Sequence, residues 1–260
     1  MFIMKPDILY RYRNANEREF SELRNNQIWF SKPSNFNDPF DCAIRFDQQA
    51  IVENVFENFF KKSSEKLDEA VLQLIRKDVF KKEFNISPVD DVLKLLREQS
   101  VISCFAEDFN SIQMWSYYAD YHKGICVGYR RNELEKYGYL NKIIYQNDIK
   151  PILESIYEMG TSLKSDKNKI FNLMRTYLFV KEKHWEHEKE WRLVRVGYSN
   201  DKYPKSILIN SPKPVVVYIG CKASKCTIDR MKIYCKETSI PIYYMSMSKN
   251  KFELKYNAIK

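Results

Sequence analysis

The stretch KHWEHEKEWRLVRV, residues 183–196, ends in the alternating pattern of a β-strand. A strand over 188–196 would place Glu188, Glu190 and Arg192 on one face. Two acids and a base in a row are costly to bury unless they pair or bind a ligand. The stretch therefore predicts either a solvated face with cross-strand ion pairs or a site built from charged groups.

The histidines of this stretch, His184 and His187, precede Glu188 and raise the question of a metal site. They lack the i, i+4 histidine spacing of the HExxH zinc motif. The chain has six cysteines and no CxxC pair. Three of these cysteines have a spacing that matches no common zinc pattern: Cys221, Cys226 and Cys235. We therefore expect no metal ligands.

Outward from this stretch, strand patterns occur toward both ends of the chain, and helical patterns group between them. Strands are predicted at 7–13, 27–31, 101–106, 124–130, 142–146, 190–196, 206–210, 215–220, 240–247 and 252–256. Helices are predicted at 16–26, 50–62, 64–84, 88–99, 111–120, 150–163, 167–183 and 226–238.

This order predicts an α+β fold with a mainly antiparallel sheet core. We expect residues 1–260 to form a single domain, with an inserted helical lobe at about 48–100. A regular βαβ alternation, a GxGxxG motif and a phosphate-loop lysine motif are all absent from the sequence. These absences argue against a dinucleotide-binding domain of the Rossmann type.

The composition and charge of the chain indicate where the protein is located and which partners it binds. The longest apolar run is well short of the roughly 20 residues that span a bilayer, and the start MFIMKPDILYRYR has charges too early for a signal peptide. We therefore expect a cytoplasmic protein without a membrane segment. A net charge of +9 favours an anionic partner, such as a nucleotide, a nucleic acid or an acidic protein. The basic runs FFKK, FKK and YRR lie in separate parts of the chain, which favours a solvated surface over one binding stripe.

The first strand carries a pair of candidate ligand-binding arginines. Arg11 and Arg13 alternate with Tyr10 and Tyr12 and so share one face. An arginine fork binds a phosphate or carboxylate in a bidentate manner, which a lysine does less specifically. The alternative is that both arginines point to solvent.

The stretch WFSKPSNFNDPFD, residues 29–41, ends a strand at Ser31 and continues into two polar turns. Turn formation explains its prolines but does not require so many side-chain acceptors beside aromatic rings. A structural role and a binding site are both open here. We expect Pro39 and Phe40 to fix the turn while Asn37 and Asp38 face a cleft near Ser31.

The stretch MWSYYADYHKG, residues 114–124, places Trp115, Tyr118 and His122 at spacings that can share one helix face. Such a cluster is either the packed edge of a core or an aromatic wall against which a base or nicotinamide ring stacks. His122 is also the best general acid–base candidate by residue type.

Taken together, these stretches resemble the bacterial domain-of-unknown-function 2971 family. The resemblance rests on LYRYR, IWFSKPSNFNDPFD, ISCFAED, MWSYYADYHKGICVGY, KHWEHEKEWRL and VYIGCKAS, in this order from residue 9 to about 224. The family has no settled activity. The resemblance implies a stand-alone cytosolic protein of a kind sometimes associated with mobile elements and phage defence.

A second resemblance is to mono-ADP-ribosyltransferases of the toxin type, through LYRYR, WFS and EKE in that chain order. It implies that NAD is the substrate. Arg11 would grip the NAD phosphates or ribose, Ser31 would hold the nicotinamide ribose, and Glu190 would bond the ribose 2′-hydroxyl. Glu188 would orient or deprotonate the acceptor. The chain has FSKPS where these enzymes have Ser-Thr-Ser, and its spacer before the glutamates is long.

The first hypothesis is thus an NAD-consuming effector, a toxin or anti-phage defence protein that modifies nucleic acid or protein. Its further nucleotide-binding residues are expected to be Arg13, Asn37, Asp38, Trp115, Tyr118 and His122. An alternative is a magnesium-dependent nuclease or phosphodiesterase, whose ligands would be Asp38, Asp41, Glu188 and Glu190. A third is a non-catalytic sensor or adaptor, with Arg192 paired to Glu190 and Asp41 to Arg45.

Overall fold

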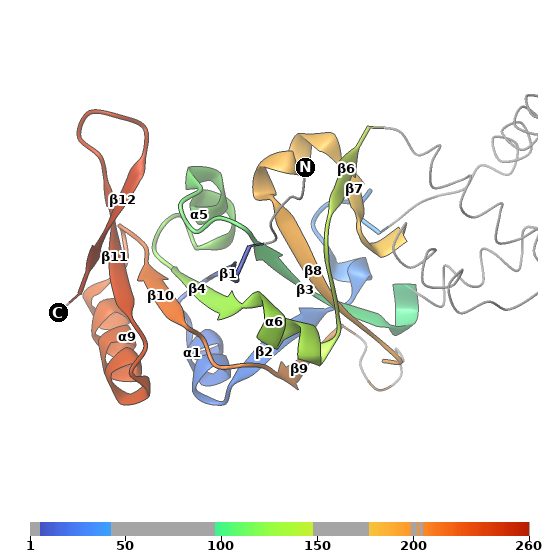
Figure 1. Ribbon diagram of the computed structural model, residues 1–260, viewed down its shortest axis with the longest axis horizontal. Helices are drawn as coiled ribbons and strands as arrows, with labels where there is room; N and C mark the ends of the chain where they lie inside the picture. The colour runs from blue at the N-terminus through green and yellow to red at the C-terminus, as the bar shows by residue number, and fades with distance from the viewer. Residues whose placement is uncertain (1–5, 43–96, 148–176, 199–201, 203–204, 260) are drawn as a thin grey trace, which may run out of the picture.

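A computed structural model describes residues 6–42, 97–147, 177–198, 202 and 205–259 (Figure 1). The helical lobe expected at about 48–100 lies almost wholly outside these residues, as do the helices expected at 150–163 and over most of 167–183. The residue ranges of the expected strands, in contrast, all fall within the described part of the chain.

A large mixed sheet, mostly antiparallel, dominates the described residues, which confirms the α+β class. Its ten strands include a path in the order β12-β11-β10-β4-β1-β3-β2-β9, and β8 joins β3 to β5. Their bounds are β1 (Ile8–Arg13), β2 (Gln27–Ser31), β3 (Ser100–Ala106), β4 (Ile125–Arg130), β5 (Tyr139–Lys142), β8 (Glu190–Val196), β9 (Ser206–Asn210), β10 (Val216–Ile219), β11 (Ile242–Met247) and β12 (Leu254–Ala258). β10 and β11 run parallel. A separate parallel pair consists of β6 (Ile144–Gln146) and β7 (Val180–Glu182).

The helices of the described part begin in most cases at a polar side chain that caps them. They are α1 (Glu17–Arg24), α5 (Ile112–Tyr118), α6 (Arg131–Leu134) and α9 (Lys225–Thr238), with 3₁₀ turns η1 (Pro33–Asn35), η2 (Glu135–Tyr137) and η3 (Lys183–Glu188). Asn16, Ser111 and Ser224 each accept a hydrogen bond from a main-chain N–H three residues later. α9 packs against the sheet at β10 and β11, with Met231 and Tyr234 in the core (Figure 1).

The sheet divides at β3, and this division positions the site. One edge of β3 pairs with β8 over the whole strand, from Ser100 opposite Val196 to Ala106 opposite Glu190. On the other edge, the register joins β3 to β1 only at Ala106 and to β2 only at Ile102. The strand between these two positions therefore borders open space rather than a continuous ladder.

Three local expectations were wrong in detail. The strand predicted at 190–196 is confirmed as β8, whereas its extension back to Glu188 is wrong, because residues Lys183–Glu188 form a 3₁₀ helix and Lys189 has a left-handed φ of 45°. The strand expected over 142–146 is interrupted at Ile143, where the chain passes from β5 to β6. The end of the helix expected over 167–183 is instead strand β7.

Candidate active site

A cavity of about 550 Å³ opens where β1 and β2 separate along β3, and α5 and η3 supply further wall residues. Of the ten residues expected at a site, seven line it: Arg11, Arg13, Ser31, Asn37, Tyr118, Glu188 and Glu190. The structure thus brings the first-strand arginines and the late glutamates together, although they are far apart in the chain. Asp38, Trp115 and His122 are not among the lining residues.

Asp38 is committed to the turn rather than to the cavity. Its carboxylate accepts a hydrogen bond from the main-chain N–H of Phe40 at 2.9 Å, the local bond of an Asx turn. The Phe40 side chain is 79% exposed, so it does not fix this turn by packing. The expectation that Asn37 and Asp38 both face the cleft is therefore correct only for Asn37.

Trp115 and His122 form the packed edge of a core. Trp115 is fully buried, and its indole N–H donates to the carbonyl of Phe109 at 2.8 Å. His122 follows the end of α5 with a left-handed φ of 69°, so it does not share the helix face. Its Nε2 lies 3.0 Å from Ser116 Oγ, and burial, followed by the charge of Lys222, lowers its pKa. Neither ring is placed to stack on a ligand in the cavity.

Arg11 is the cation of the cavity that lacks a carboxylate partner among the described residues. Its Nη2 donates to the Trp29 carbonyl across the gap between β1 and β2 at 2.7 Å, while Nη1 is buried without an acceptor there. Arg13, in contrast, forms ion pairs with Glu19 and Glu22. Burial, and then the charge of Arg13, lowers the pKa of Arg11 to about 9, which leaves the guanidinium charged at neutral pH.

The opposite edge of β3 carries a buried cluster of five charged side chains. Its members are Asp41, Lys181, Glu188, Glu190 and Arg192, each at most 7% exposed. Lys181 Nζ lies 2.6 Å from Glu188, 3.1 Å from Glu190 and 3.7 Å from Asp41. Arg192 donates through Nε to Glu190 at 2.8 Å and through Nη2 to Asp41 at 2.6 Å. Three carboxylates and two cations leave this cluster with one net negative charge.

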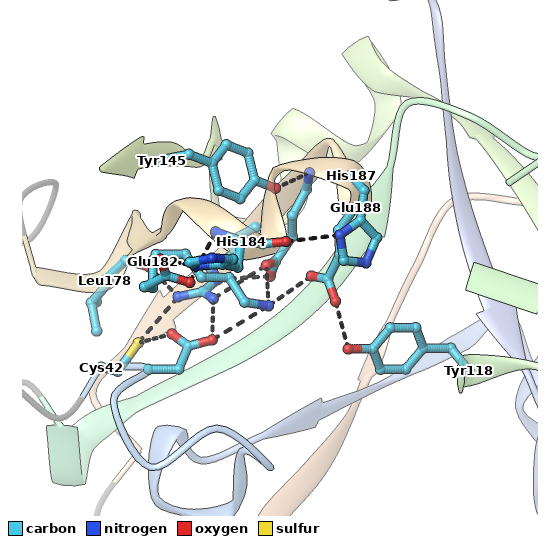
Figure 2. Close-up of polar contacts among 12 residues, drawn as sticks. Cys42, Tyr118, Tyr145, Leu178, Glu182, His184, His187 and Glu188 are labelled. Carbon is cyan, nitrogen blue, oxygen red and sulfur yellow. Dashed lines mark hydrogen bonds and ion pairs between the residues drawn. The ribbon is translucent and has the colours of Figure 1, made fainter. Parts of the chain in front are cut away.

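Two tyrosines orient the glutamates of this cluster. The Tyr118 hydroxyl donates to Glu188 Oε1 at 2.6 Å, and Tyr145 Oη accepts the main-chain N–H of Glu190 at 2.7 Å (Figure 2). Burial, and then the charge of Glu188, raises the pKa of Tyr118, so its hydroxyl remains a donor. Glu188 is consequently held between a phenol and an ammonium group.

Glu190 remains ionised at every physiological pH. Burial alone would raise the pKa of its carboxyl group, but the charges of Arg192 and Lys181 outweigh burial and lower this pKa to about 2. Such a carboxylate can stabilise a nearby positive charge, but it is a poor proton donor or acceptor near neutral pH.

The local chain path explains how the charged groups converge. Glu190 and Arg192 share a face of β8 because side chains alternate along a strand. Lys189 is left-handed, and this turn directs Glu188 into the same cluster although it lies outside the strand. The pairing of Arg192 with Glu190 agrees with the third hypothesis, whereas Asp41 pairs with Arg192. Arg45, the partner expected for Asp41, lies outside the described residues.

Sequence reasoning did not single out Lys181. This residue fell at the end of an expected helix, yet it forms more ion pairs with the cluster carboxylates than any other described lysine. Charge balance could have pointed to it, because burying three carboxylates around one arginine demands a further cation.

The comparisons with known proteins add a family match without an activity. Residues 114–193 match the family described as Protein of unknown function (DUF2971). The matched segment includes Tyr118, Lys181, Glu188 and Glu190 but excludes Arg11. No curated protein and no solved structure matches the chain. No helix of the described part is both long and apolar enough to cross a membrane.

Proposed function

We propose that the cavity binds NAD and that the protein transfers its ADP-ribose group to an acceptor. One observation carries the proposal. Within the described part of the chain, the same cavity has an arginine without a carboxylate partner at one edge of β3, and a carboxylate cluster with net negative charge at the other. NAD has a matching pair of charges, because its pyrophosphate is anionic and its nicotinamide ring is cationic.

The size and lining of the cavity support a ligand of this kind. A volume of about 550 Å³ falls within the range of small-molecule sites, roughly 300–1,000 Å³. The rings of Trp29, Phe105 and Tyr117 contribute to the wall and offer flat surfaces to adenine or nicotinamide. Arg11 Nη1 has no acceptor among the residues that the structure describes and is available to a phosphate oxygen.

The chemistry follows from the charge of Glu190 and the position of Glu188. When the bond between ribose C1′ and the nicotinamide nitrogen breaks, its electron pair neutralises the nicotinamide and leaves positive charge on the ribose. The ionised Glu190 stabilises this charge. An acceptor hydroxyl or amine then bonds to C1′ and releases a proton. Glu188, which lines the cavity and is oriented by Tyr118, is the group that orients this acceptor and takes the proton.

The experiment is nicotinamide release from NAD labelled in its adenine half, with labelled product detected on protein or nucleic acid. Glu188→Gln should lower kcat by about 100-fold or more, because it removes the proton acceptor. Glu186→Gln is the matched control, since Glu186 is exposed on the same 3₁₀ helix and undergoes the same chemical change. Wild-type protein that releases no nicotinamide and labels no acceptor would refute the proposal.

A second candidate is a nucleotide sensor without catalysis. It is favoured by the pairing of Glu190 with both Arg192 and Lys181, which gives this carboxylate a structural role. The sensor would bind NAD in calorimetry and leave it intact. A magnesium nuclease is less well supported, because Lys181 and Arg192 engage the carboxylates that would serve as ligands.

A further inference from the structure

The positive charge of this protein is concentrated in its last fifty residues. Residues 211–260 contain ten Lys and Arg but three Asp and Glu, a formal net charge of +7, whereas the whole chain carries +9. The preceding 210 residues are therefore nearly neutral in total. The separate basic runs elsewhere in the sequence conceal this asymmetry, because acidic residues balance them.

This basic segment forms one end of the sheet. It contains β10, α9, β11 and β12, which lie side by side at the left of Figure 1. None of the residues that line the cavity comes from it. Whatever the segment binds, the contact is separate from the candidate active site.

One face of this end of the sheet carries a cluster of aromatic rings. Tyr218 and Tyr243, on β10 and β11, have ring centroids 5.3 Å apart and nearly parallel planes. Tyr256, on β12, meets both rings edge-on, at 5.8 Å and 5.5 Å. Phe109 stacks on Tyr218 at 4.1 Å. Tyr256 is half exposed, so the edge of the cluster faces solvent.

The turn that joins β11 to β12, the strands that carry Tyr243 and Tyr256, contains lysines and a further ring. Lys249 and Lys251 lie in the turn and are exposed, whereas the exposed Lys255 on β12 points to the face opposite Tyr256, because side chains alternate along a strand. No ion pair joins them to any residue that the structure describes. Phe252, between them in the turn, is fully exposed. An exposed phenylalanine flanked by unpaired lysines has no packing role in the described fold.

We propose that this surface, defined by Lys249, Lys251, Phe252 and Tyr256, binds single-stranded nucleic acid. Lysines attract the phosphate backbone, and exposed rings stack on bases that are not paired in a duplex. Sheets that display aromatic residues beside basic ones bind single strands in this way. The opposite face of the sheet is covered by α9, and on the aromatic face Tyr256 is the half-exposed ring of the cluster. The inference does not depend on NAD chemistry in the cavity.

Fluorescence anisotropy with labelled oligonucleotides of mixed sequence tests the surface, with single strands of RNA and DNA and the matching duplexes measured over a salt series. We expect single strands to bind more tightly than duplexes and to weaken as salt rises. Each lysine that neutralises a phosphate of a single strand contributes about 0.7 to the slope of log affinity against log salt. Lys249→Glu with Lys251→Glu should therefore lower the slope by about 1.4 and weaken binding at least tenfold.

Matched variants separate this surface from general charge. Lys183→Glu with Lys205→Glu makes the same charge change at two exposed lysines elsewhere and should leave binding within about twofold. Phe252→Ala should weaken binding about fivefold or more, because a stacked base is lost. Phe40→Ala, at another exposed phenylalanine, should have no effect.

Three results would overturn the proposal. The first is wild-type affinity in the Lys249 and Lys251 double variant. The second is an equal loss in the two double variants, which would mean that net charge alone drives binding. The third is binding to phosphatidylserine vesicles, but not phosphatidylcholine vesicles, by a protein that binds no oligonucleotide.

Discussion

Lys181→Met tests whether the charged cluster behind the cavity holds the fold together. The lysine ammonium is buried and lies within 3.7 Å of three carboxylates, two of them at hydrogen-bonding distance. Methionine keeps the length and apolar character of the stem without the charge. The substitution leaves Asp41, Glu188 and Glu190 with Arg192 as the remaining cation of the cluster.

The expected loss follows from this imbalance. Removing one partner of a buried ion pair costs about 3–5 kcal/mol, because the remaining charge is neither solvated nor paired. For a chain of this size, such a loss lowers Tm by about 10 °C. The pKa of the Glu190 carboxyl group should rise in the variant, since a cation that lowers it is gone. One carboxyl group can then take up a proton, so the deficit should shrink as pH falls from about 7 to about 5.

Urea denaturation at both pH values, followed by circular dichroism, measures this loss. Lys142→Met is the control, because Lys142 pairs with Glu107 at 2.7 Å but both side chains are partly exposed. An exposed pair contributes about 0–1 kcal/mol. Equal losses in the two variants, or a Lys181→Met deficit that is the same at both pH values, would refute the reasoning.

Three further predictions concern stability. Gly124→Ala should lower the free energy of unfolding, measured in urea, by about 3 kcal/mol, because a Cβ there would lie 2.1 Å from a main-chain oxygen of β1. Gly197→Ala is the control: a Cβ there would meet nothing within 4 Å, so the loss should be only the strain of its φ of +97°, about 1–2 kcal/mol. Tyr118→Phe removes the 2.6 Å bond to a buried carboxylate and should cost about 1.5–3 kcal/mol, so an unchanged Tm would contradict the role given to this hydroxyl. The ionised Glu190 should contribute fully to the free energy of unfolding above its ordinary pKa of 4.5, and this contribution should disappear as pH falls through about 2. A protein that is already fully unfolded at a pH above 4.5 in an acid titration would argue against this prediction.

Most of the secondary structure was predictable because its causes are local. Strands β1, β2 and β8 follow the period-two alternation of their side chains, β4 is a short apolar run, and α1 and α9 begin at side chains that cap main-chain N–H groups. The errors occurred where one residue changes the path, as at Lys189, whose left-handed conformation no neighbouring pattern indicates. Lysine is not a residue type that favours this region.

For the candidate site, the sequence predicted several of the residues that take part but not the contacts between them. Arg11, Glu188 and Glu190 stood out because charged groups beside apolar strands require an explanation. His122 was chosen by residue type, and its position after α5 turns it toward Ser116 instead of the cavity. Lys181 was overlooked because a single lysine in a lysine-rich chain carries no signal of its own.

The sequence by itself determined most of the strand positions in the described part of the chain, the α+β class and the charge asymmetry of the last fifty residues, because these depend on neighbours in the chain. Only the tertiary structure decided which charges meet. Arg192 and Asp41 are 151 residues apart, and Tyr118 and Glu188 are 70 apart. Such contacts depend on how the strands pair around β3, and strand pairing is a non-local choice that no single stretch of sequence encodes.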